Sequence, residues 1–281
     1  MTMSNQDQKA IFITGSSSGL GRATAKLFAA KGWKVIASMR NPDKEKELAK
    51  TSDVILMALD ITEPQQIESV AQEVVGSGGV DVVLNNAGSG LAGALEGLTD
   101  EQILRIVNTN MLGTIRTTKA FIPHFRQKRA GLFINTTSIG GRMTVPFNSI
   151  YHATKWALEG WSESMAFELN QFGIGIKTVE PGGMKTDFFT RSFDTGRHPA
   201  YDALVNKVMG IITDPKQMAT YSSPEQIAEV VYEAATDGKD QLRYIAGADA
   251  KAIYAMRLQL GEEAFRQAMA QQFFGDAPKA A

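Results

Sequence analysis

Apolar and polar positions follow two patterns along the chain, one typical of strands and one typical of helices. Seven short runs rich in β-branched residues predict strands, and several are apolar on both faces, as a parallel sheet covered by helices requires; they span residues 10–14, 33–38, 54–59, 81–84, 132–136, 174–179 and 241–246. Apolar residues at helical spacing predict helices over residues 20–31, 64–75, 100–129, 151–172, 224–236 and 250–274. This alternation predicts a single doubly wound α/β domain over residues 1–281, with parallel strands and right-handed crossovers.

Two segments depart from this rhythm. Pro123 lies inside the helix predicted over residues 100–129 and should kink or break it. Residues 182–222 have no clear strand, and they mix Gly, Pro and Asp with large apolar residues: Met184, Phe188, Phe189, Phe193, Met209, Ile211, Ile212 and Met218. A long irregular insertion in a compact domain is usually functional, so this segment is expected to form a substrate-binding lid. The three phenylalanines suit either a hydrophobic clamp over substrate or a helix face packed on the core.

Composition narrows the possible functions. A formal net charge of -1 argues against a nucleic-acid binder. The absence of cysteine excludes disulfides, thiolate metal sites and cysteine nucleophiles, and it fits a reducing cytoplasm. The polar N-terminus lacks the apolar core of a secretory signal, and no apolar run approaches the roughly 20 residues that span a bilayer. His124, His152 and His198 are scattered rather than set at metal-ligand spacing, and His152 is expected to be structural or on the surface. We therefore expect a cytoplasmic protein without a metal site.

A glycine-rich turn follows the first predicted strand and leads into a helix. Gly15 allows a tight turn, Gly19 allows a pyrophosphate to approach the backbone, and Gly21 allows helix and strand to pack closely. The helix N-terminus then presents free N–H groups and a partial positive charge to phosphates. Glycines and serines also make ordinary turns, so the strand–turn–helix context carries the interpretation. It predicts a Rossmann-type dinucleotide site.

The end of the second strand bears on the choice of dinucleotide. Sites that use NAD normally place Asp or Glu there to bind the ribose 2′-hydroxyl. Here the strand ends with Ser38 and Met39, and Arg40 follows. A guanidinium suits a 2′-phosphate, because it donates two charge-assisted hydrogen bonds. The alternative is a solvated arginine that caps the loop. The pattern favours NADP(H) over NAD(H), with Arg40, Ser16 or Ser17 and Ser38 at the phosphate.

A tyrosine and a lysine stand four residues apart at the start of the helix predicted from residue 151. Tyr151 and Lys155 therefore share a helix face. A free tyrosine is a poor base at neutral pH, and a nearby ammonium would lower its pKa towards the working range. Ser138, after the fifth strand, could donate a hydrogen bond to a substrate carbonyl. Tyr and Lys at this spacing are common on ordinary helices, so the pair gains weight only from its surroundings.

Together these motifs make the sequence resemble the short-chain dehydrogenase/reductase family, in the branch whose first turn reads TGxxxGxG. The matching segments are Thr14-Gly15-Ser16-Ser17-Ser18-Gly19-Leu20-Gly21, Asn85-Asn86-Ala87-Gly88, Asn110-Met111-Leu112-Gly113, Ser138, Tyr151-x-x-x-Lys155, and Pro181-Gly182 with Thr186. Two departures are mild. Thr137-Ser138 stands where two serines are frequent, and Gly183 stands where many members differ.

The resemblance implies a role for each matching position. Tyr151 would be the general acid in reduction and the base in oxidation, Ser138 would position the carbonyl, and Lys155 would bind the nicotinamide ribose and lower the pKa of Tyr151. Asn110 would hold a water that connects Lys155 to solvent. The implied cofactor contacts of the glycine turn are Gly15, Ser16, Ser17, Ser18, Gly19, Leu20 and Gly21, and those after the second strand are Ser38 and Arg40. Asp60, followed by Ile61, would lie near the adenine, and Asn86, Ala87 and Gly88 would lie along the cofactor. Pro181, Gly182, Gly183, Met184 and Thr186 would lie near the nicotinamide and phosphates.

The expected function is therefore an NADP(H)-dependent oxidoreductase that interconverts a carbonyl and an alcohol on an apolar or partly apolar small molecule. The family also implies a homo-oligomer, a dimer or a tetramer. One alternative is an NADP-sensing regulatory protein without turnover, which would be expected to have lost Ser138, Tyr151 or Lys155. The sugar-nucleotide epimerase and dehydratase branch has a different glycine spacing and a larger C-terminal domain.

Overall fold

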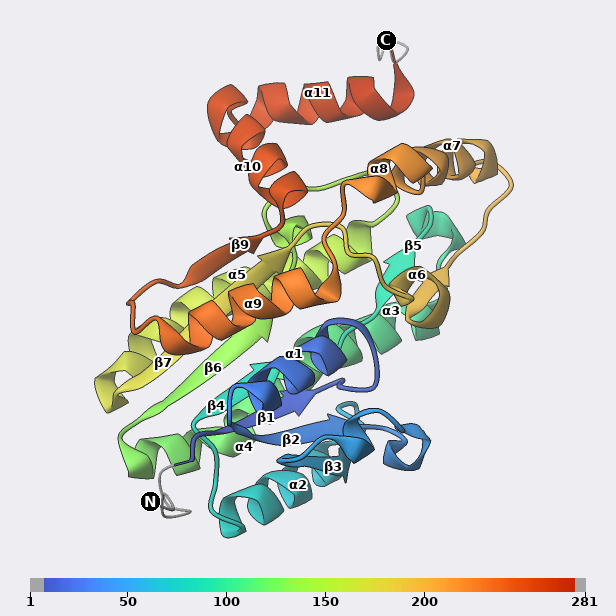
Figure 1. Cartoon of the computed structure of the whole chain (residues 1–281). Helices are drawn as coiled ribbons and strands as arrows, with labels where there is room; N and C mark the ends of the chain where they lie inside the picture. Colours follow the sequence, from blue (N-terminus) through green and yellow to red (C-terminus); the bar gives the residue numbers. More distant parts are fainter. Residues whose placement is uncertain (1–7, 276–281) are drawn as a thin grey trace.

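A parallel sheet flanked by helices on both faces forms the centre of the molecule (Figure 1). The structure is a computed structural model that describes residues 8–275, with residues 189 and 190 described without their side chains. Within this part of the chain the sheet has seven strands in the order β3-β2-β1-β4-β6-β7-β9. Their bounds are β1 Ala10–Thr14, β2 Lys34–Met39, β3 Val54–Ala58, β4 Val82–Asn85, β6 Gly131–Thr136, β7 Ile174–Pro181 and β9 Arg243–Ala246. This is the predicted doubly wound, Rossmann-type α/β fold in a single domain, and all seven predicted strands are confirmed.

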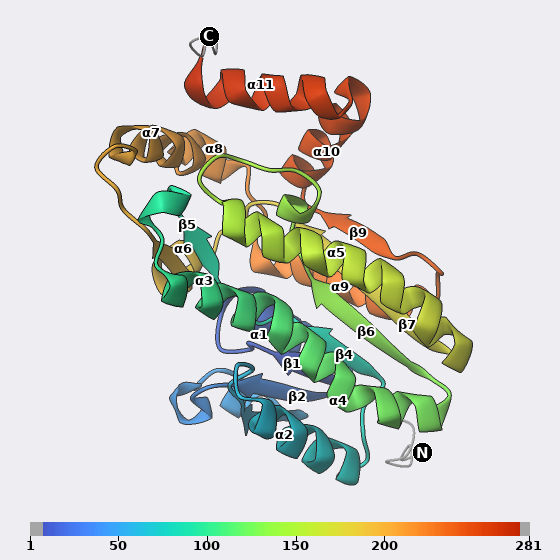
Figure 2. The same ribbon diagram turned by 180° about the vertical axis from the view of Figure 1, so that it is seen from behind.

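Two apolar cores fix the helices on the two faces of the sheet. Figures 1 and 2 show α1 and α9 over one face and α2, α4 and α5 over the other. Phe28 and Val231 belong to the first core, and Phe121 and Phe133 belong to the second, all of them fully buried. The helices of the described chain are α1 Gly19–Ala30, α2 Pro64–Gly76, α3 Asp100–Val107, α4 Gly113–Lys128, α5 Ser149–Leu169, α6 Phe188–Arg191, α7 Asp202–Ile212, α8 Pro215–Ala219, α9 Pro224–Thr236, α10 Ala248–Leu260 and α11 Glu262–Phe274. The strand order reverses between β1 and β4, where open sheets of this kind form ligand sites.

The helix predicted over residues 100–129 breaks at a different point from the one expected. A π-helical segment, Asn108–Leu112, separates α3 from α4, whereas Pro123 lies inside an unbroken α4. The prediction of a break at Pro123 is therefore wrong. Pro123 is exposed, so the carbonyl that loses its helical partner faces solvent, and buried Phe121 and Phe125 on either side hold the helix on the sheet.

The elements in the C-terminal region and in the insertion also differ from those predicted from the sequence. Two helices, α10 and α11, replace the single helix predicted over residues 250–274, because Gly261 adopts φ 76° and ψ 169° between them. The insertion, residues 182–222, contains α6, α7, α8 and a short strand β8, Phe193–Thr195. β8 pairs in parallel with β5, Gly90–Ala92, in a small second sheet that was not predicted.

The C-terminal helices cover the insertion at one end of the sheet (Figures 1 and 2). Val208 of α7 and Phe265, Met269 and Phe273 of α11 share a third apolar cluster. Met143, from the connection between β6 and α5, belongs to the same cluster. None of the helices in residues 8–275 combines the length and the hydrophobicity needed to cross a bilayer.

Candidate functional site

The glycine turn after β1 has a shape that larger side chains would not fit. Gly15 has φ 71°, and a Cβ built on it would lie 2.8 Å from the Cα of Ala87. Gly19 also has a positive φ, of 50°, and Gly21 packs directly on the carbonyl of Gly15. Ser18 is the N-cap of α1, but its hydroxyl caps none of the first N–H groups, and the first turn carries no acidic residue. The N-terminus of α1 therefore offers free donors and a partial positive charge to an anion.

Two serines predicted at the phosphate site have structural partners instead. Ser16 and Ser38 are buried, and their hydroxyls donate to the carbonyl of Ile13 at 3.1 and 3.0 Å. The Ser16 N–H also donates to the Ser38 carbonyl at 3.0 Å, which ties the turn to the end of β2. These hydroxyls hold the turn in place, and neither points freely towards the position of a ligand.

Arg40 is exposed directly after β2, whereas Met39 is only 3% exposed and packs in the core beside α1. A second guanidinium, which the sequence analysis missed, lies close to the turn. Arg22 on α1 donates to the Ser17 carbonyl at 2.5 Å and forms an ion pair with the buried Glu45 at 2.8 Å. The sequence signal for it was a single charge directly after the last glycine of the motif.

The connections after β3 and β4 contain the other predicted cofactor contacts at this edge of the sheet. Asp60 accepts hydrogen bonds from the Thr62 N–H and hydroxyl at 2.9 and 2.7 Å, and Ile61 packs against Gly113 at the start of α4. The turn at Asn86, Ala87 and Gly88 is fixed to the glycine turn. The hydroxyl of Thr14 accepts from the Asn86 and Ala87 N–H groups at 2.9 and 3.1 Å, and the Asn86 amide donates to the Thr14 carbonyl at 3.0 Å.

The predicted segment after β7 closes towards the same turn. Thr186 lies beside Gly19, where a built Cβ would meet its Cγ2 at 3.4 Å. Pro181 ends β7, Gly182 donates to the carbonyl of Ala246, and Met184 bridges to Ser222. Gly183 donates its N–H to the carboxylate of Asp249 at 2.7 Å, so α10 anchors this turn.

Tyr151 and Lys155 occupy successive turns at the start of α5, as their spacing predicted. The Lys155 Nζ lies 5.8 Å from the centre of the Tyr151 ring and donates to the Thr136 carbonyl at 3.0 Å. Ser138 follows β6, and its hydroxyl accepts the Gly140 N–H at 2.9 Å. The Tyr151 phenol is within hydrogen-bonding reach of Ser138. The structure thus brings the three predicted catalytic residues together.

The electrostatics of this group differ in one respect from the prediction. Tyr151 is partly buried, and desolvation raises the pKa of its phenol, with a smaller lowering by the Ser138 hydrogen bond. The net shift of the Tyr151 pKa is thus opposite in direction to the predicted lowering, because desolvation is its largest cause. Burial also lowers the pKa of Lys155 to about 8, and the nearby Glu159 carboxylate opposes this shift.

Asn110 is buried in the π-helical segment between α3 and α4. Its side chain accepts from the Ser89 N–H at 2.8 Å and donates to the Ser89 carbonyl at 2.9 Å and to the Thr154 hydroxyl at 3.2 Å. A Cβ built on Gly88 would lie 3.4 Å from Asn110 Oδ1 and 3.8 Å from Lys155 Nζ, so both polar groups flank this glycine. The role predicted for Asn110, holding a water next to Lys155, stays a prediction.

A buried group of charges behind Lys155 was missed by the sequence analysis. Glu159 accepts from the Thr137 hydroxyl at 2.5 Å and from Arg243 Nε at 3.0 Å. Glu180, on β7, is fully buried 3.9 Å from the same guanidinium. Burial raises the pKa of Glu180, and the Glu159 carboxylate raises it further. Only the helical spacing of Lys155 and Glu159 could have revealed part of this group.

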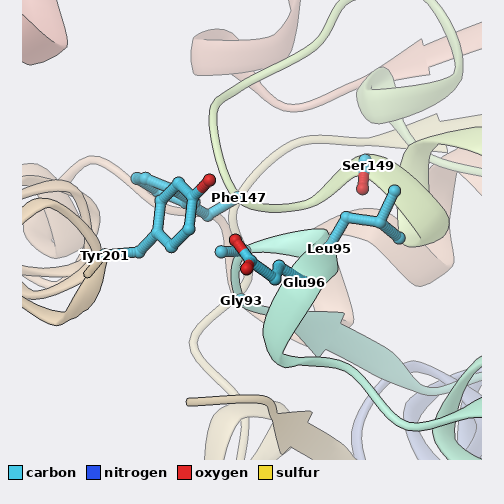
Figure 3. A pocket seen from close by; sticks show the side chains of 7 residues that line it. Gly93, Leu95, Glu96, Phe147, Ser149 and Tyr201 are labelled. Atoms are coloured by element: carbon cyan, nitrogen blue, oxygen red, sulfur yellow. The ribbon is translucent and has the colours of Figure 1, made fainter. Parts of the chain in front are cut away.

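Two hollows flank the loop that joins β6 to α5. One, of about 470 Å³, is lined by Gly93, Leu95, Phe147, Ser149 and Tyr201 among others (Figure 3). The other, of about 490 Å³, is lined by Val145, Phe147, His152 and Trp156 among others. Neither hollow is lined by Ser138, Tyr151 or Lys155. Of the predicted phenylalanine group, Phe193 packs against Gly90 and lies 6.0 Å from the Phe188 ring, and the side chain of Phe189 lies outside the described residues.

The family of the chain follows from comparison with known proteins. A family model described as short chain dehydrogenase matches residues 9–196. The chain belongs to the short-chain dehydrogenase family. It is therefore an oxidoreductase of a family that uses nicotinamide cofactors and acts on small molecules. Within residues 8–275 no group of three or more His, Asp or Glu side chains is placed to hold a metal ion.

Two curated relatives illustrate the range of similar short-chain dehydrogenases. An uncharacterized oxidoreductase of Schizosaccharomyces pombe is 38% identical over 229 residues, which cover 81% of this chain and 96% of the relative. The human 17-beta-hydroxysteroid dehydrogenase type 1 is 30% identical over 285 residues, which cover 95% of this chain and 87% of the relative.

Solved structures show the same fold. A short-chain dehydrogenase from Streptomyces avermitilis has a TM-score of 0.82 and 30% identity, with 96% of this chain and 97% of that chain covered. An alcohol dehydrogenase from the archaeon Thermococcus sibiricus, complexed with 5-hydroxy-NADP, has a TM-score of 0.71 and 26% identity, with 86% and 97% covered.

Proposed function

We propose that this short-chain dehydrogenase interconverts a carbonyl and an alcohol on an apolar or partly apolar small molecule, with NADP(H) as cofactor. The observation that carries the proposal is the grouping of Ser138, Tyr151 and Lys155 beside the glycine turn. A hydroxyl, a phenol and an ammonium in this arrangement can orient a carbonyl oxygen and protonate it.

The residues at the edge of the sheet fit a phosphorylated dinucleotide. The free N–H groups of α1 and the close backbone approach at Gly15 suit a pyrophosphate. Arg40 is exposed after β2, where no carboxylate stands to repel a 2′-phosphate. Arg22 beside Ser17 adds a second guanidinium at the same turn, although its ion pairs with Glu45 and Glu47 offset much of its charge. The ligand 5-hydroxy-NADP in the Thermococcus sibiricus alcohol dehydrogenase supports the choice of NADP(H).

The chain's own residues account for the movement of the proton. NADPH, when bound, supplies the hydride that reduces the carbonyl carbon. The Ser138 hydroxyl donates a hydrogen bond to the carbonyl oxygen, and the Tyr151 phenol transfers its proton to that oxygen. The phenol is protonated at neutral pH, which is the form that the general acid of reduction requires, but its raised pKa makes it a weaker acid until a nearby positive charge stabilises the phenolate. The Lys155 ammonium stabilises the phenolate that results, and it would bind the ribose hydroxyls of the cofactor.

The substrate class is inferred from the insertion and from one relative. Residues 182–222 bring apolar side chains over the edge of the sheet, and Phe193 and Phe188 lie together beside β5. The human relative is named for a hydroxysteroid, which is a largely apolar alcohol. We therefore expect ketones with an apolar body to be better substrates than sugars of similar size.

A purified-protein assay tests the proposal. NADPH consumption would be followed with a panel of steroidal, long-chain and aromatic ketones and aldehydes, with sugars as polar comparators. Tyr151→Phe keeps the ring and removes the acidic proton, so turnover should fall about 10²–10⁴-fold while NADPH binding survives. Tight NADPH binding by the wild type without turnover on any member of the panel would favour a cofactor-sensing protein instead.

A further inference from the structure

His152 links two backbone groups within the loop that joins β6 to α5, those of Gly140 and Val145. Its Nε2 accepts the Val145 N–H at 3.0 Å, and its Nδ1 lies 2.8 Å from the Gly140 carbonyl oxygen. A backbone N–H can only donate, so Nε2 must be the unprotonated nitrogen and Nδ1 carries the proton that it gives to Gly140. Burial lowers the pKa of His152, which keeps the ring in this neutral form.

The Gly140 contact leads directly to Ser138. The Gly140 N–H donates to the Ser138 hydroxyl at 2.9 Å, so Gly140 contacts the serine through its N–H and the imidazole through its carbonyl, in the two peptide groups that flank its Cα. A Cβ built on Gly140 would lie 3.0 Å from His152 Nδ1 and 3.3 Å from Ser138 Oγ. Glycine at this position therefore lets the two side chains approach from either side.

Other contacts also fix this loop. Phe147 lines both hollows, its ring meets those of Tyr201 and Phe274 edge-on, and its carbonyl accepts the Gly93 N–H at 2.8 Å. Phe147 also has φ 60°, a conformation that costs free energy for a residue with a side chain. In addition, the His152 ring meets the Tyr151 ring edge-on, with 5.8 Å between centroids. His152 thus contacts the loop, the tyrosine and, through Gly140, the serine.

We propose that His152 is a positioning residue that holds the loop between β6 and α5, and through the backbone of Gly140 orients the Ser138 hydroxyl towards the substrate carbonyl. The proposal rests on the function proposed above in assigning Ser138 to the carbonyl. Of the two roles expected for His152, the structure supports a structural one, because the ring is buried and hydrogen-bonded, and the proposal adds an effect on turnover to it.

Two amide variants separate the contact of His152 with Gly140 from its contact with Val145. In His152→Asn the amide nitrogen occupies the position of Nδ1 and can still donate to Gly140, but it does not reach Val145. In His152→Gln the amide oxygen occupies the position of Nε2 and can still accept from Val145, but the donor to Gly140 is lost. His152→Leu removes both. His124→Asn is the matched control, because His124 also contacts backbone groups, those of Val80, far from Ser138.

The expected pattern concerns kcat rather than KM or the NADPH dissociation constant. His152→Asn should keep kcat within about tenfold of the wild type, the loss that one neutral hydrogen bond corresponds to. His152→Gln and His152→Leu should lose about 10²-fold, as expected for a displaced catalytic group. NADPH affinity should be unchanged in every variant, and His124→Asn should keep the wild-type kcat. Equal losses in the Asn and Gln variants, or an unchanged kcat in the Leu variant, would overturn the proposal.

Amide hydrogen exchange tests the contacts of His152 with Gly140 and Val145 without the need for turnover. Exchange at Gly140 should quicken in the Gln and Leu variants but not in the Asn variant, and exchange at Val145 should quicken in the Asn and Leu variants. Unchanged exchange at both amides in the Leu variant would overturn the proposal even if no substrate is found. Absence of turnover in the wild type would instead count against the proposed function alone.

Discussion

At the residue scale, the proposed preference for NADP(H) rests mainly on Arg40, the exposed guanidinium after β2. Arg40 should contribute a charge-assisted hydrogen bond to the 2′-phosphate, worth roughly 1.5–3 kcal/mol or about one to two decades of affinity. The wild type should therefore prefer NADPH over NADH by at least about tenfold in kcat/KM, and Arg40→Ala should remove most of that preference. Paired kinetics with one ketone at fixed ionic strength measure it.

The burial of each residue decides which variant and which control test the role of Arg40. Met39 stands where a carboxylate would favour NAD, but it packs in the core, so Met39→Asp would bury a charge and destabilise the fold. Arg40→Ala is the cleaner change, since Arg40 is exposed. Arg126→Ala, an exposed arginine near the end of α4, should leave the preference unchanged. Equal use of NADPH and NADH by the wild type would remove Arg40 from its assigned role.

The pH dependence of reduction should report on Lys155 rather than Tyr151. Lys155 has a pKa of about 8, so its stabilising charge is present below that pH and is lost as the pH rises through it. Tyr151 has a raised pKa and stays protonated over the same range. The kcat for carbonyl reduction should therefore fall above about pH 8.

Glu159→Gln tests this assignment, because the Glu159 carboxylate holds the pKa of Lys155 up. Without that charge the basic limb of the kcat profile should move to lower pH. Glu263→Gln, at an exposed carboxylate on α11, serves as the control and should leave the limb in place. A limb that does not respond to Glu159→Gln would mean that another group titrates there.

At the element scale, the long periodic segments were predictable and the short ones were not. Most strands of the main sheet are buried on both sides, so their apolar composition identifies them, whereas the edge strand β3 is only partly buried. β5 and β8 have three residues each and depend on a partner about a hundred residues away, which no local pattern encodes. Likewise, Ser138, Tyr151 and Lys155 follow from spacing and motif, whereas the His152 link and the Glu159–Arg243 pair depend on tertiary contacts.

Gly261 shows how one residue decides between one helix and two. Its φ of 76° and ψ of 169° lie in a region that is essentially restricted to glycine. Gly261→Ala should therefore cost about 1–3 kcal/mol of unfolding free energy. Gly210→Ala is the matched control, since Gly210 lies inside α7 with open space around it, and alanine there should stabilise by about 0.5–1 kcal/mol. Urea unfolding of both variants measures the difference, and a Gly261→Ala protein as stable as the wild type would contradict the assignment.

At the scale of the whole molecule, the insertion is held at two different places. Its first part, around Thr186, lies against the glycine turn at Gly19. Its later part, α7, packs against α11 through Val208 and Phe265. The first contact is with a segment that would bind the cofactor, and the second is with apolar residues remote from it. The insertion should therefore not respond to ligand as one rigid lid.

Hydrogen exchange with and without NADPH can separate the two parts. We expect residues 183–195 to gain protection when NADPH is added, because the cofactor would fill the space between the glycine turn and the segment after β7. Residues 202–212 should change little, since α11 already protects the buried face of α7 through side chains that do not depend on ligand. The six-residue segment 224–229 in α9, capped by Ser223 and Gln226, provides an internal reference that should not change. Equal gains in both parts of the insertion would indicate a single closing lid, and no gain in residues 183–195 would mean that they are fixed scaffold rather than a cover for the site.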